Sequence, residues 1–191
     1  MKLLIRALAK FLCGLAAVML LLFLPAGSIY YINGWLFIGI LFIPMLFLGA
    51  VLLIKAPDLL AKRLDVKEQE GTQKGVVALS GILFLGGFIA AGLDHRFGWS
   101  FVPFWLVIAA SIVLVVSYAL YGEVMRENTY LSRTVQVQEG QKVIDTGLYG
   151  IVRHPMYAVT VPLFLSMPLV LGSWISLILF LPYPVIIAVP P

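Results

Sequence analysis

The residues best suited to chemistry stand next to one another late in the chain, in Arg153-His154-Pro155-Met156-Tyr157. Arg153 is a permanent cation and His154 can gain a proton near neutral pH, so both can bind an anionic group. Pro155 favours the first turn of a helix, because its missing N–H would have no partner there, and it keeps the preceding residue extended. The free backbone amides and positive dipole end of such a helix would add to the two side chains. The stretch therefore predicts a site for a carboxylate or a phosphate at the start of a helix.

Arg153 and His154 also have a second interpretation, as an anchor at the membrane surface. Basic side chains gather beside membrane spans on the cytoplasmic side. An apolar run follows the pair, and this is consistent with both interpretations. Spacing alone therefore leaves both the anion site and the anchor open.

The composition indicates the environment in which such a site must work. The 191 residues are 62% apolar and 12% charged, and their mean hydropathy is +1.05. An ordinary soluble domain has an apolar share of about 45 to 50%. The chain is therefore predicted to be an integral membrane protein with the lipid bilayer as its partner. The net charge of +4 does not indicate a nucleic-acid partner, because the basic residues lie in short segments beside apolar runs.

Six apolar runs predict an all-α fold, a polytopic transmembrane helical bundle that forms a single membrane domain over residues 1–191. The runs are 7–26, 35–54, 76–93, 102–121, 156–171 and 174–189. The first four approach the ~20 residues that cross a bilayer, and they make up residues 1–121. The last two have 16 residues each and contain four prolines, which predicts a short, kinked helical hairpin over 156–189 that turns at Gly172-Ser173. The single cysteine, Cys13, lies in the first run, and no metal site is predicted.

The charged residues outside these runs predict the orientation. Twelve of the 13 Lys and Arg residues lie in segments that alternate spans would put on one side. The positive-inside rule therefore places the N-terminus, both long loops and the C-terminus in the cytoplasm. The first run follows Lys2, Arg6 and Lys10, so a cleaved signal peptide is an alternative to the uncleaved helix that we favour. The other five runs would keep the same orientation in either case.

Residues 122–155, between the fourth and fifth runs, carry four basic and four acidic side chains. Burying each charge in lipid would cost about 2.5 to 3.5 kcal/mol, so this segment is predicted to be cytoplasmic. Its first part, 123–132, is predicted to extend the fourth helix, and 134–138 alternates like a short strand. Earlier in the chain, Pro57 predicts the start of a short helix at the membrane surface.

Two features around the third run are interpreted as structural. Gly87 and Ala91 form a pair of small residues that would let another helix approach closely. The loop from Asp94 to Trp99 mixes charged and aromatic side chains, as expected for a segment anchored at the membrane interface. His95 in this loop is assigned a structural role.

The stretch Arg153-His154-Pro155-Met156-Tyr157 resembles the Arg-His-Pro-x-Tyr signature of the isoprenylcysteine carboxyl methyltransferase family, integral membrane enzymes that use S-adenosylmethionine. Further blocks are similar to prokaryotic members of this family and occur in the same order. They are 57–60 with Arg63, 92–100, 127–132 and 138–144. The resemblance covers most of the chain from Trp35 onward and implies a prokaryotic inner (plasma) membrane.

The resemblance implies that 122–155 is a cofactor-binding segment and that S-adenosylmethionine is the cofactor. The implied cofactor-binding residues are Gln136, Gln141, Lys142, Val143, Ile144, Tyr149, Arg153, His154, Pro155, Met156 and Tyr157. Residues 154–157 would line the methionine and ribose, and Tyr149 would form a wall beside the sulfonium or the adenine. Residues 141–144 would approach the nucleoside.

The implied reaction is methyl transfer to a lipidic acceptor at the cytoplasmic face of the membrane. The favoured acceptor is the carboxylate of an isoprenylcysteine-like molecule, which is ionised at neutral pH and needs no general base. A phospholipid amine or another amphiphile stays open as the acceptor. The protein would act mainly by aligning the acceptor with the methyl group.

The chain departs from the family pattern in ways that bear on activity. Family members carry an arginine and a Glu-Glu pair after the last span, whereas this chain ends at Val189-Pro190-Pro191, so its catalytic residues are unknown. Leu148 and Gly150 replace a proline and a basic residue that are common in the family. A shortened product with weak turnover is therefore expected. Two alternatives are a catalytically incomplete scaffold of the same family and a related membrane reductase, for which 122–155 has no glycine fingerprint.

Overall fold

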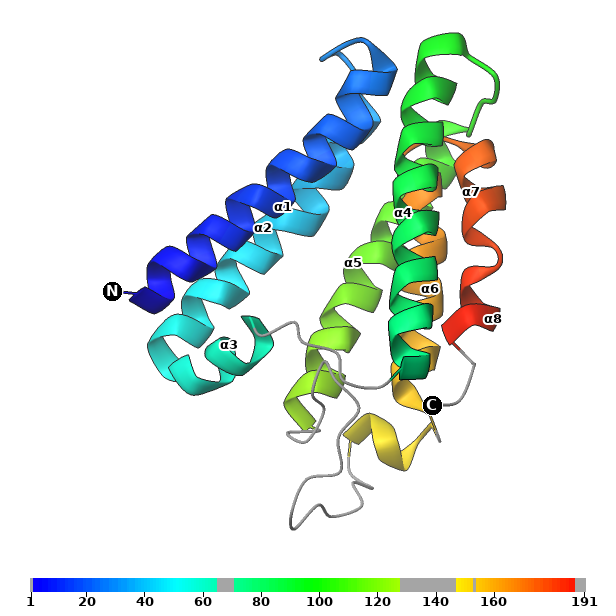
Figure 1. Ribbon diagram of the computed structural model, residues 1–191. Coiled ribbons are helices and arrows are strands. Elements are labelled where there is room, and N and C mark those ends of the chain that lie inside the picture. Colours follow the sequence, from blue (N-terminus) through cyan, green and yellow to red (C-terminus); the bar gives the residue numbers. More distant parts are fainter. Residues whose placement is uncertain (1, 65–70, 128–146, 153, 188–191) are drawn as a thin grey trace.

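The computed structural model describes residues 2–64, 71–127, 147–152 and 154–187, which form helices joined by short turns (Figure 1). Within these ranges every regular element is helical and no strand occurs. The predicted all-α bundle is therefore confirmed. The predicted strand at 134–138 and the predicted helix extension beyond Glu127 lie outside the described residues.

Four helices in the described part of the chain are long and apolar enough to cross a membrane. They are α1 (Lys2–Ala26), α2 (Ile32–Lys55), α4 (Gly71–Phe97) and α5 (Phe104–Glu127). At a rise of ~1.5 Å per residue each is longer than the ~30 Å hydrocarbon core of a bilayer. A short helix, α3 (Pro57–Leu64), follows α2 and begins at the predicted proline.

The last described part of the chain forms helices on either side of a turn at Gly172-Ser173. Helix α6 (Pro155–Val170) packs along α5, while α7 (Trp174–Phe180) and α8 (Tyr183–Ile187) pack against α4. The final apolar run divides at Leu181-Pro182, because Pro182 has no N–H with which to continue a helical ladder. The turn between α6 and α7 depends on Gly172, which has φ +78° and lies so close to α2 that an added Cβ would stand 2.4 Å from the side-chain amide nitrogen of Asn33.

Two glycines of α4 allow its neighbours to approach closely. A Cβ added at Gly87 would stand 2.1 Å from the ring of Phe180 on α7, which confirms the predicted close contact at this position. A Cβ added at Gly92 would stand 2.5 Å from the backbone oxygen of Leu22 on α1. The backbone of α1 therefore approaches α4 closely at Gly92.

The turns at one end of the bundle are joined by Asp94, which is only 2% exposed. Its carboxylate accepts hydrogen bonds from the backbone N–H of Ser100 (2.7 Å), from the Ser100 hydroxyl (2.5 Å) and from the Ser173 hydroxyl (2.5 Å). Ser173 also caps α7 by accepting a hydrogen bond from the N–H of Ser176. We call this end, at the top of Figure 1, the Asp94 end. Asp94 itself is thus buried and links elements, whereas the sequence predicts a surface anchor.

His95, beside Asp94, has the structural contact that the sequence predicts. Its ring stacks on Tyr31 with a centroid separation of 4.3 Å, and the Tyr31 hydroxyl donates a hydrogen bond to the backbone oxygen of Leu171 (2.5 Å). Tyr31 precedes α2 and Leu171 follows α6. The contacts therefore hold the start of α2 and the end of α6 together.

Candidate functional site

The predicted site lies at the other end of the bundle, where α6 begins, and we call this the His154 end (Figure 1). Pro155 occupies the first turn of α6, as the sequence predicts. His154 is the cap residue with an extended φ of −133°, and its carbonyl accepts hydrogen bonds from the N–H groups of Tyr157 (3.1 Å) and Ala158 (3.2 Å). Pro155 has no N–H, so the N–H of Met156 is the donor of the first turn that is left for an acceptor from outside the helix.

The side chains of the signature divide into two groups. Pro155 is buried and Met156 is half-buried, so they fix α6 against its neighbours. His154 is exposed, and Tyr157 is 43% exposed. The rings of these two residues are neighbours, with centroids 5.9 Å apart and planes inclined at 38°. An aromatic face and an imidazole therefore stand together beside the helix start.

Tyr149 belongs to a short 3-10 turn, η1 (Gly147–Gly150), that packs against α5. The turn begins at Gly147, whose φ of +57° favours glycine, and it is closed by a hydrogen bond from the N–H of Val152 to the carbonyl of Leu148 (2.9 Å). Tyr149 is half-buried and contacts other residues. Because α6 packs along α5 as well, Tyr149 and His154 lie at the same end of the bundle.

The other predicted contacts fall in parts of the chain that the structure does not describe. They are Gln136, Gln141, Lys142, Val143, Ile144 and Arg153. The structure therefore positions Tyr149 and 154–157, and the remaining residues stay predictions. In the described part of the chain, no group of three or more His, Cys, Asp or Glu side chains is arranged to hold a metal.

The sequence predicts no role for three tyrosines at this end of the bundle. Tyr118 and Tyr121 lie one turn apart on α5 and pack against the core, while Tyr183 on α8 is buried. The spacing of Tyr118 and Tyr121 predicts that they share a face of a helix. Tyr183, 62 residues after Tyr121, packs against the rings of Phe84 on α4 and Phe164 on α6.

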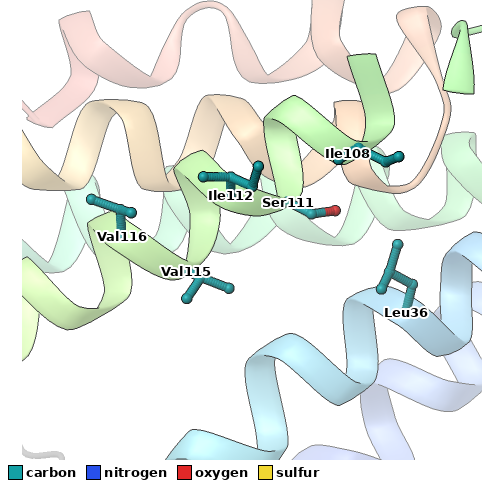
Figure 2. A pocket seen from close by; sticks show the side chains of 6 residues that line it. All are labelled: Leu36, Ile108, Ser111, Ile112, Val115 and Val116. Carbon is teal, nitrogen blue, oxygen red and sulfur yellow. The ribbon is translucent and has the colours of Figure 1, made fainter. Parts of the chain in front are cut away.

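An apolar groove of about 320 Å³ lies between α2 and α5 (Figure 2). Its lining residues are Leu36, Ile108, Ser111, Ile112, Val115 and Val116. The one hydroxyl in this lining, on Ser111, donates to the backbone oxygen of Val107 (2.8 Å). At about 100° per residue, the groove residues lie on the side of α5 opposite its buried residues Leu114 and Val124. The groove is therefore separate from the site at the His154 end.

One comparison with known proteins covers the start of α6. Residues 97–189 match the family model of phospholipid methyltransferases. The phospholipid methyltransferase match begins at the last residue of α4 and includes α5, η1, α6, α7 and α8, so it contains Tyr149 and 154–157. No curated protein and no solved structure matches the chain.

The phospholipid methyltransferase match and the signature differ in how closely they specify an acceptor. The match covers the segment in which the sequence predicts the cofactor site, and it leaves out α1, α2 and α3. The narrower resemblance to isoprenylcysteine carboxyl methyltransferases stays a prediction.

Proposed function

We propose that this protein is a membrane methyltransferase that transfers a methyl group from S-adenosylmethionine to a lipidic acceptor. The observation that carries the proposal is the phospholipid methyltransferase match over residues 97–189. The start of α6 supports it, because His154 and Tyr157 stand together there, at the end of the bundle where η1 also packs. The distribution of Lys and Arg supports a site at the cytoplasmic face.

The described residues fit the chemical groups of the cofactor. S-adenosylmethionine supplies an electrophilic methyl group on a positively charged sulfur. The N–H of Met156 and the positive dipole end of α6 suit its carboxylate. The rings of Tyr149 and Tyr157 suit its sulfonium or its adenine. Further proposed contacts are Gln136, Gln141, Lys142, Val143, Ile144, Arg153, His154, Pro155 and Met156.

Two acceptors follow from two separate observations. The matched family is named for phospholipids, and a phospholipid amine must lose a proton before its nitrogen can attack a methyl group. The Arg-His-Pro-x-Tyr signature favours the carboxylate of an isoprenylcysteine-like molecule, which is already ionised at neutral pH. With either acceptor, the residues act by aligning the acceptor with the methyl group and by excluding water.

Methyl transfer tests this proposal directly. The purified protein in nanodiscs is incubated with methyl-labelled S-adenosylmethionine and with either phosphatidylethanolamine or a prenylated cysteine. Label is expected in the lipid fraction above that of protein-free nanodiscs, and the labelled acceptor identifies the class. Cofactor binding without labelling of either acceptor would contradict the enzyme and favour the catalytically incomplete scaffold.

A further inference from the structure

The apolar groove between α2 and α5 lies inside the part of the molecule that is suited to cross the bilayer. Both walls belong to helices long and apolar enough to span a membrane, and Figure 2 shows α5 as one wall and Leu36 of α2 on the other. Among the described residues, no charged side chain lines the groove, and its one hydroxyl, on Ser111, already donates to the backbone oxygen of Val107. An occupant would meet no free polar group here, so the groove suits a hydrocarbon chain.

The groove lies in the half of the bundle nearest the Asp94 end, where both α2 and α5 begin. Leu36 and Ile108 each follow the start of their helix by four residues, or about 6 Å at ~1.5 Å per residue. Val116, at the other end of the groove, lies about 12 Å further along, near the middle of the 24 residues of α5. Because one leaflet contributes about half of the ~30 Å hydrocarbon core, the groove spans most of one leaflet.

The size of the groove suits one chain rather than a whole lipid. Its volume of about 320 Å³ lies at the lower limit of the ~300 to 1,000 Å³ of ligand pockets. The groove is also continuous with surface that faces lipid in a bilayer, because Ile112 and Val116 in its lining are 60% and 51% exposed. A chain in the groove would therefore stay joined to a headgroup and a second chain outside it.

Trp105 places a hydrogen-bond donor at the mouth of the groove. It precedes Ile108 by three residues, so the two side chains share a side of α5, and Trp105 is 68% exposed. The indole N–H groups of Trp35 and Trp174 donate to backbone oxygens (2.8 and 3.0 Å), whereas that of Trp105 has no partner in the described part of the chain. Indole rings at a membrane interface lie among lipid chains and direct the N–H to polar groups. The Trp105 N–H therefore suits an ester or phosphate oxygen of a lipid.

The position of the groove separates such a lipid from the methyl acceptor. The proposed methyl-transfer site lies at the start of α6, at the His154 end, whereas the groove ends near the middle of α5. A lipid with its headgroup beside Trp105 belongs to the leaflet at the Asp94 end. The groove also lies between α5, which is inside the phospholipid methyltransferase match, and α2, which is outside it. A chain there would fill the space between these two parts of the molecule.

We propose that the groove between α2 and α5 binds one acyl chain of a phospholipid from the leaflet at the Asp94 end, with the headgroup beside Trp105. This phospholipid is a structural lipid that packs α2 against α5. Lipid chains are as apolar as the helices, so its binding depends on van der Waals contact in a fitted groove rather than on the hydrophobic effect. The inference does not depend on the proposed methyltransferase function.

Native mass spectrometry of the purified, delipidated protein tests the proposal. The probe is palmitoyl-oleoyl phosphatidylcholine, titrated into the protein in detergent. A distinct complex of one lipid per chain is expected at lipid concentrations too low for a second lipid to bind. Binding without a preferred one-to-one complex would overturn the proposal. A lipid-free dimer that Val115→Trp dissociates would also overturn it, because a second copy of the chain would then occupy the groove.

Two matched variants locate the lipid. Val115 and Val113 are on α5 and similarly exposed (48% and 43%), but only Val115 lines the groove. Val115→Trp is expected to weaken the one-to-one complex at least about fivefold, because it overfills the space for the chain. Val113→Trp is expected to leave the complex unchanged. Equal lipid affinity of the two folded variants would overturn the groove as the site.

Trp105→Phe tests where the headgroup lies, and it still decides if Val115→Trp does not fold, judged by circular dichroism. The change keeps an aromatic ring and removes the N–H, so it is expected to weaken the complex about two- to tenfold, the range for one hydrogen bond. Trp99→Phe is the matched control, because Trp99 is also at the Asp94 end and is 56% exposed. Equal effects of the two variants would overturn the placement of the headgroup.

The outcomes separate this inference from the proposed function. A one-to-one lipid complex in a protein that transfers no methyl group would contradict the enzyme and leave the structural lipid intact. Methyl transfer by a protein that forms no such complex would overturn the structural lipid and leave the enzyme intact.

Discussion

His154 and Tyr157 owe their accessibility to the residues between and after them. Pro155 and Val159 are buried and fix the first turns of α6, whereas His154 and Tyr157 keep their rings exposed and adjacent. The His154 carbonyl accepts the first hydrogen bonds of this turn, and Pro155 itself contributes no N–H.

We expect His154→Ala to weaken S-adenosylmethionine binding by roughly ten- to a hundredfold, the range for losing a hydrogen bond to a charged group. Calorimetric titration of the purified protein in detergent measures the affinity. His95→Ala is the control, because it removes the only other histidine, which lies at the Asp94 end. Unchanged affinity in His154→Ala would remove His154 from the cofactor site.

The helices owe their close packing to glycines at particular places on α4. Gly92 lets the backbone of α1 approach, whereas Gly86, on the same helix, has nothing within 4 Å of an added Cβ. Between membrane helices, close approach of backbones is a main source of association, because lipid tails are as apolar as the helices themselves. The contact at Gly92 is therefore expected to determine how firmly α1 is held.

For these elements, we expect Gly92→Ala to destabilise the protein by about 1 to 3 kcal/mol, since the added methyl group would overlap the Leu22 carbonyl and force α1 away. Gly86→Ala is the matched control and is expected to stabilise by up to about 1 kcal/mol through helix propensity. Denaturant unfolding in detergent, followed by circular dichroism, measures both. Equal stabilities of the two variants would contradict the close contact.

For the whole molecule, the two ends of the bundle differ in chemistry. The Asp94 end has a buried carboxylate that joins α4 to two turns, while the His154 end carries the proposed site and α3. The excess of Lys and Arg in the segments at the His154 end favours the cytoplasm for that end. This orientation would give a cytosolic cofactor direct access to α6.

Two variants in a Cys13→Ala background, each with a single cysteine at one end of the bundle, test this orientation. We expect Tyr30→Cys, at the Asp94 end, to react with a membrane-impermeant maleimide in intact cells, because Tyr30 is 82% exposed. Asp58→Cys on α3 is expected to react only after the membrane is disrupted. Labelling in the reverse order would contradict a cytoplasmic site.

The sequence by itself determined the helices and predicts where the proposed site lies. Apolar runs in a bilayer must satisfy their backbone groups internally, so α1, α2, α4 and α5 follow from composition and length. The start of α6 follows from Pro155, whose ring and missing N–H suit a first helical turn. The signature around it then points to the chemistry.

Only the tertiary structure decided which faces of these helices meet. Along a membrane helix the lipid-facing and core-facing residues are similarly apolar, so no periodic pattern predicts the contact of Gly92 with Leu22 or the burial of Asp94. The contacts of Tyr183 with Phe84 and Phe164 depend on the turn at Gly172, which folds α7 and α8 back along α4. Contacts between segments far apart in the chain are formed by packing, and packing is what local sequence leaves open.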